Sequence, residues 1–92
     1  MENEKWHLIS STGVAPKQLY YIYKKRGVKY ELEANVHYDK KGNPHPFGKL
    51  RLTVNNKKTY YFDSYQELAT FLIKRNIPLT GVEDIVRLWF KL

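Results

Sequence analysis

A chain of 92 residues has room for one domain, since single domains commonly run from about 50 to 250 residues. Its composition, 42% hydrophobic and 15% aromatic, can build a core, and the lack of cysteine excludes disulfide scaffolds, thiolate metal ligands and thiol nucleophiles. The net charge is +7, the start of the chain is acidic, and no apolar run approaches the roughly 20 residues of a membrane helix. We therefore expect residues 1–92 to form a single cytoplasmic domain with no membrane contact.

The first 27 residues give a mixed pattern. Residues 6–9 fit either a short edge strand or an ordered arm. Over residues 18–26, Leu19, Ile22 and Tyr23 share one helical face, a Pro precedes the segment and a Gly follows it, which favours a helix. The same segment is rich in tyrosine, which also suits a strand.

Strict alternation predicts that the next segment is a strand. From Val28 to Tyr38 apolar and polar side chains alternate without a break, as in a strand with one buried face. Two further strands are predicted over residues 49–55 and 59–62, joined by a tight turn. Between the first two strands, residues 40–48 contain two Gly, two Pro and an Asn, so we expect a long hairpin loop that continues neither ladder.

Two helices are predicted after the strands. Ser64 and Glu67 have the spacing of a capping box, and apolar residues recur at helical spacing from Tyr65. After Pro78, a second capping box over residues 80–83 begins a C-terminal helix that extends to residue 92. The predicted fold is α+β, a three-stranded antiparallel sheet packed against helices, with an extra C-terminal helix.

The positive charge is concentrated in the middle of the chain. Between Lys17 and Lys58 the sequence has eleven Lys and Arg against three Asp and Glu, whereas the two flanks together have five against six. Clustered cations gain affinity for a polyanion by releasing the counterions condensed on its phosphates. The other interpretation is a solvated basic surface that keeps the protein soluble.

The predicted order over residues 17–76, helix, three strands and helix, resembles the double-stranded-RNA-binding domain. The sequence Gly42-Asn43-Pro44-His45 is similar to the Gly-Pro-x-His element of that family. The resemblance implies that residues 18–26, the loop over 40–48 and the start of the helix over 63–68 contact duplex RNA, with His45 reaching a minor groove.

Residues 29–73 alone are similar to the arm-binding domains of phage-type integrases and to ethylene-response-factor type domains. In this segment, as in those two families, three predicted strands precede a helix. This resemblance implies that the exposed sheet face enters the major groove of DNA, where Lys49 and Arg51 would lie among the contacts.

We therefore predict a small basic protein that binds duplex RNA or DNA and is not an enzyme. No nucleophile elbow, phosphate-binding loop or metal-ligand spacing is present, so we expect no catalytic residue, metal or cofactor. The predicted nucleic-acid contacts are Lys24, Lys25, Arg26, Lys40, Lys41, His45, Lys49 and Arg51.

A protein–protein interaction module is the alternative. Trp89 and Phe90 make the C-terminal helix strongly apolar, and exposed aromatic clusters mark interfaces. In that case the protein is an inhibitor or adaptor of the kind that phages and mobile elements encode, it docks on an acidic protein, and it is a monomer or a homodimer.

Overall fold

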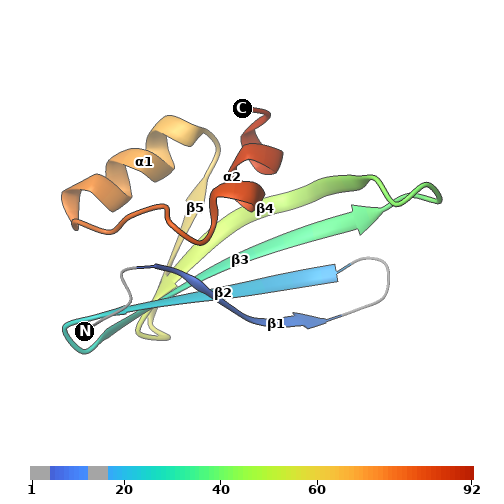
Figure 1. The fold of residues 1–92 in the computed structure, drawn as a ribbon. Coiled ribbons are helices and arrows are strands. Elements are labelled where there is room, and N and C mark those ends of the chain that lie inside the picture. The colour runs from blue at the N-terminus through green and yellow to red at the C-terminus, as the bar shows by residue number, and fades with distance from the viewer. Residues whose placement is uncertain (1–4, 13–16) are drawn as a thin grey trace.

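The computed structural model describes residues 5–12 and 17–92. Five strands lie in chain order across one antiparallel sheet: β1 (His7–Thr12), β2 (Lys17–Lys25), β3 (Val28–Tyr38), β4 (Pro44–Val54) and β5 (Lys58–Phe62). Two helices, α1 (Tyr65–Lys74) and α2 (Glu83–Phe90), cover the same face of this sheet (Figure 1). The fold is α+β, but the prediction of a three-stranded sheet is wrong, because the sheet has five strands.

The two additional strands come from the N-terminal part of the chain. Residues 18–26, for which the sequence favours a helix, form β2 and the start of its turn, and β2 pairs with β3 along its whole length. β1 then pairs with the other side of β2, so that residues 6–9 contribute to an edge strand. The helix prediction fails because β2 has apolar residues on both faces: Tyr23 is buried under the helices, while Tyr20 and Ile22 lie on the opposite face. Apolar residues on both faces hide the alternation of apolar and polar side chains that indicates a strand in a sequence.

The loop between β3 and β4 is shorter than predicted. It spans residues 39–43, and the Pro-containing segment after it belongs to β4, with Pro44 opposite Tyr38 and Pro46 opposite Val36. β5 pairs with β4 only from Leu50 onward, so the first part of β4 is a local edge of the described sheet. On the outer side of an edge strand there is no neighbouring strand, so a proline interrupts no ladder hydrogen bond there. This explains why β4 tolerates Pro44 and Pro46.

The hydrophobic core fills the space between the sheet and the two helices. Leu32, Leu50, Leu52 and Leu68 are fully buried there, and each contributes roughly 1.5–3 kcal/mol of transfer free energy. The other buried hydrophobic residues are Trp6, Tyr23, Tyr30, Ala34, Val36, Phe62, Phe71, Leu72, Ile77, Val82, Ile85 and Val86.

The capping box predicted for α1 is present. The Glu67 backbone N–H donates to Ser64 Oγ (3.2 Å), and Glu67 Oε1 accepts from the backbone N–H of Asp63 (2.8 Å). The capping box predicted over residues 80–83 is not formed, because Val82 occupies the N-cap of α2 without a side-chain bond and Glu83 accepts from the backbone of Gly81. Neither described helix is long and apolar enough to cross a membrane.

Trp6 joins the beginning of the described chain to the segment between the helices. Its Nε1 donates to the carbonyl of Pro78 (2.8 Å) and its backbone N–H to that of Thr80 (2.7 Å). Gly81 lies so close that a Cβ built on it would be 2.3 Å from the Trp6 carbonyl oxygen. A residue with a side chain cannot replace this glycine without displacing the backbone.

Candidate nucleic-acid interface

Three basic segments meet at one end of the molecule: the β2–β3 turn, the β4–β5 turn and the end of α1 (Figure 1). The two turns are joined by a pair of hydrogen bonds of 2.8 Å between Lys29 and Asn55, one from each backbone N–H. Lys25 Nζ connects the first turn to α1 by donating to the carbonyls of Arg75 (3.1 Å) and Asn76 (2.8 Å). We call this surface the basic end, and define it as Lys24, Lys25, Arg26, Lys29, Lys57, Lys58, Lys74 and Arg75.

The cations of the basic end are not neutralised by carboxylates. Within the described parts of the chain, the ion pairs join His45 to Asp39, Lys49 to Asp63 and Arg51 to Glu33, and none involves the basic end. Glu31 is connected to the basic end indirectly, through Asn56. In the orientation of the Asn56 amide that satisfies both contacts, its oxygen accepts from Lys29 Nζ (3.2 Å) and its nitrogen donates to Glu31 Oε1 (3.0 Å).

Two members of the basic end are held by hydrogen bonds to backbone carbonyls. Lys25 satisfies backbone carbonyls where α1 ends, which is the role of a C-terminal cap. Arg75 donates to the Phe71 carbonyl (3.0 Å), and its guanidinium carbon lies 3.6 Å from the centroid of the Phe71 ring. By contrast, Lys24, Arg26, Lys57 and Lys74 are exposed, and their charges face solvent.

Two hollows open at the basic end, and Arg26 lines both. The first, of about 580 Å³, is formed by residues 24–29. The second, of about 250 Å³, lies between the β2–β3 turn and the end of α1, where Lys74 and Arg75 join the lining. A larger and shallower hollow of about 690 Å³ runs along α1, but Glu67 lies in its wall, so we do not count it in the interface.

The other predicted loop contacts, Lys40, Lys41 and His45, lie at the opposite end of β3. This strand has 11 residues, which at roughly 3.3 Å per residue separates the two ends by about 35 Å. The sequence groups Lys24–Arg26 with this loop, but the structure does not bring them together. His45 Nε2 lies 3.0 Å from Asp39 Oδ2, so this imidazole is engaged within the loop. No cluster of three metal-ligating side chains is found in residues 5–12 and 17–92.

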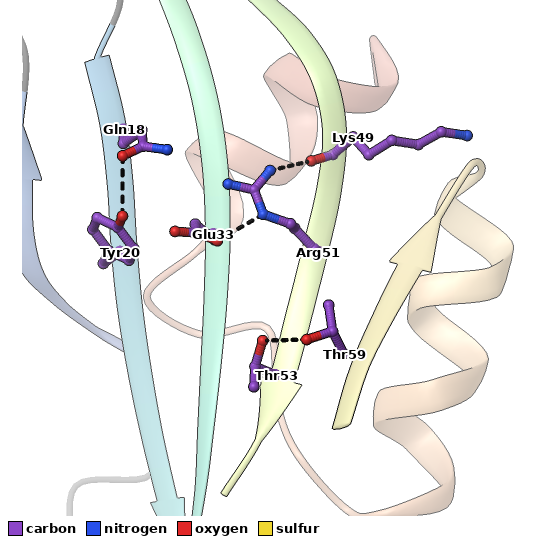
Figure 2. Close-up of polar contacts among 7 residues, drawn as sticks. All are labelled: Gln18, Tyr20, Glu33, Lys49, Arg51, Thr53 and Thr59. Atoms are coloured by element: carbon purple, nitrogen blue, oxygen red, sulfur yellow. Dashed lines mark hydrogen bonds and ion pairs between the residues drawn. The ribbon is translucent and has the colours of Figure 1, made fainter. Parts of the chain in front are cut away.

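Lys49 and Arg51 lie on the face of the sheet that the helices leave uncovered, which we call the open face. Arg51 Nε donates to Glu33 Oε1 (2.6 Å) and its NH1 to the Lys49 carbonyl (3.1 Å), as Figure 2 shows. Lys49 Nζ is bonded to Asp63 Oδ1 (2.7 Å), which raises the pKa of its ammonium group. Both cations predicted to read DNA bases are thus engaged by carboxylates of the protein itself.

Two further pairs of polar side chains on the open face bond one another. Tyr20 donates to Gln18 Oε1 (3.0 Å), and Thr53 and Thr59 share a hydroxyl bond (3.0 Å) across β4 and β5 (Figure 2). The Glu33 carboxylate raises the pKa of the Tyr20 hydroxyl. Tyr61, at 60% exposure, is the most open aromatic residue on this face.

Trp89 and Phe90, predicted as a docking surface, are partly buried against the core. The ring of Phe90 meets that of Tyr65 edge-on at 6.3 Å, so α2 packs against the first turn of α1. Their role in binding a partner stays a prediction.

Comparisons of the chain with protein-family models, with curated proteins and with solved structures give no match. Residues 29–73 form three strands of the five-stranded sheet, β3, β4 and β5, followed by the helix α1. The functional assignment therefore depends on geometry and charge.

Proposed function

We propose that this protein is a small non-enzymatic nucleic-acid-binding protein that contacts the phosphate backbone through the basic end. One observation carries the proposal: cations from three separate segments gather at one end of the molecule, and in the described chain no carboxylate pairs with any of them. Such a surface binds phosphates by releasing condensed counterions, an interaction that needs no base recognition.

The number of cations in the basic end determines how strongly the nucleic-acid affinity should depend on salt. Lys25 and Arg75 donate to backbone carbonyls of the fold, so the six other members of the basic end are the ones that we expect to meet phosphates. Two of these six also contact uncharged side chains, Lys29 that of Asn56 and Lys58 the ring of Tyr60. At a slope of about −0.9 per neutralised phosphate, the logarithm of the affinity should fall against the logarithm of salt with a slope of about −4 to −6. Fluorescence anisotropy of labelled duplex RNA, duplex DNA and single-stranded RNA from about 50 to 200 mM salt measures this slope and identifies the preferred form.

A pair of charge reversals tests where the nucleic acid binds. Lys24 and Lys29 lie directly opposite each other on β2 and β3, so Lys24→Glu with Lys29→Glu removes two adjacent contacts. We expect a loss of at least about tenfold in affinity at 100 mM salt and a slope less negative by about two.

Lys40→Glu with Lys41→Glu is the matched control, since it makes the same charge change at the other end of β3. We expect it to leave the salt slope unchanged. If the control pair loses binding and the first pair does not, the hairpin loop is the interface and the basic end is not. If no nucleic acid binds at about 50 mM salt, the proposed function is wrong.

A further inference from the structure

Arg26 occupies a backbone conformation that disfavours its own side chain. Lys25 pairs with Val28, so Arg26 and Gly27 alone connect β2 to β3. Both have positive φ, 51° and 80°, as the central residues of a type I′ turn do. Asn or Gly is the preferred residue at the first of these positions: Gly has no Cβ to clash with the backbone, and the short polar side chain of Asn can bond locally.

The β4–β5 turn shows the preferred solution in the same molecule. Its two residues with positive φ are Asn55 and Asn56, at 51° and 57°. Apart from Asn76, the remaining non-glycine residue with positive φ in the described chain is Lys91, at the C-cap of α2. Arg26 is thus an arginine at a turn position where the β4–β5 turn has asparagine.

The fold makes no use of the Arg26 side chain. It is exposed, and within residues 5–12 and 17–92 no hydrogen bond, ion pair or ring contact engages its guanidinium. The side chain lies at the junction of the two hollows, with Lys24 and Lys29 in one and Lys74 in the other. A strained residue that contributes nothing to packing, at the centre of an unpaired cationic surface, indicates a role in binding.

We propose that Arg26 makes the central phosphate contact of the basic end, through the bidentate geometry that a guanidinium offers to a phosphate, and that the two hollows hold the phosphates on either side of it. This inference depends on the proposed function and deepens it. The ligand is then a nucleic-acid strand that is bound through successive phosphate groups of its backbone. The β2–β3 turn lies between two neighbouring phosphates.

Three variants separate binding from strain. Arg26→Asn removes the guanidinium and relieves the backbone strain, and should lose about tenfold or more in affinity for the preferred nucleic acid while the melting temperature rises by about 4 °C. Arg26→Lys keeps the charge and the strain, and should lose about threefold in affinity with an unchanged melting temperature, because an ammonium group cannot bind bidentately. Lys91→Asn is the matched control, because it removes one cation and relieves one strained residue at the C-cap of α2. This position lies near the start of α1, away from the basic end. The variant should gain stability while losing less than about twofold in affinity.

The two hollows are tested by Lys24→Ala and Lys74→Ala, each of which should make the salt slope less negative by about one. If only one of them does so, the phosphates lie on one side of Arg26 and the two-sided arrangement is wrong. If Arg26→Asn binds as tightly as the native protein while Lys24→Glu with Lys29→Glu abolishes binding, the inference about Arg26 is overturned and the proposed function stands. A fall in melting temperature for Arg26→Asn would also overturn it, since Arg26 would then serve the fold.

Discussion

Asp39 organises the β3–β4 loop through its side chain. Its Oδ1 accepts the backbone N–H groups of Lys41 and Asn43 (2.9 Å each), and its Oδ2 lies 3.0 Å from His45 Nε2. The bond from His45 is the main cause that lowers the pKa of Asp39 to about 2, with the two backbone bonds adding to it. A carboxylate that accepts several hydrogen bonds is stabilised in its charged form.

This geometry predicts the titration of Asp39. An NMR titration of its carboxyl carbon should give a midpoint near 2, and His45→Ala should move that midpoint upward toward 3.8. Because the folded pKa lies below the unfolded value, the stability that Asp39 contributes is complete above pH 3.8 and is lost as the pH falls through about 2. A midpoint that His45→Ala does not move would contradict the assignment.

The elements that the sequence predicts correctly are those with one clear periodicity. β3 alternates without interruption, and its buried positions are the apolar ones, such as Leu32 and Val36. α1 begins at the predicted cap, Ser64. β2 could not be recognised in the same way, because Tyr20 and Ile22 lie on the open face and give the strand apolar residues on both sides. Pairing with β3, a contact that no local pattern encodes, decides its structure.

The cap that β2 provides for α1 leads to a prediction for this element. Lys25→Met keeps the length of the side chain and removes both hydrogen bonds to the carbonyls that end α1. We expect the free energy of unfolding to fall by about 1 kcal/mol, because these carbonyls lose a charged donor at the negative end of the helix dipole.

Urea denaturation measures this loss, with Lys24→Met as the control. Lys24 is exposed at the neighbouring position, so its substitution should change the unfolding free energy by less than about 0.5 kcal/mol. The order should reverse in nucleic-acid affinity, where Lys24→Met loses more than Lys25→Met. Equal stability losses in the two variants would contradict a capping role for Lys25.

For the whole molecule, the sequence predicts the amount of positive charge but not its distribution in space. Apart from Lys49 and Arg51, the cations over residues 17–58 separate to the two ends of β3. Lys74 and Arg75, outside that stretch, join one of these ends through the packing of α1. Lys49 and Arg51, which have the right chemistry to read bases, are instead paired with Asp63 and Glu33. These outcomes depend on strand register and helix position, which the spacing of charges along the chain does not contain.

Under the proposed function, the elongated shape also determines how many copies of the protein a nucleic acid can hold. The molecule measures 42 × 26 × 25 Å, and the basic end lies where β2 meets β3 and β4 meets β5, at one end of the long strands (Figure 1). In the proposed binding mode, the long axis therefore points away from the nucleic-acid backbone. An end face 25–26 Å across covers about seven or eight base pairs at 3.4 Å per step, and molecules bound next to one another stand side by side. Titration of a long duplex at low salt should therefore saturate at one protein per about seven or eight base pairs, whereas a protein lying along its long axis would occupy about twelve.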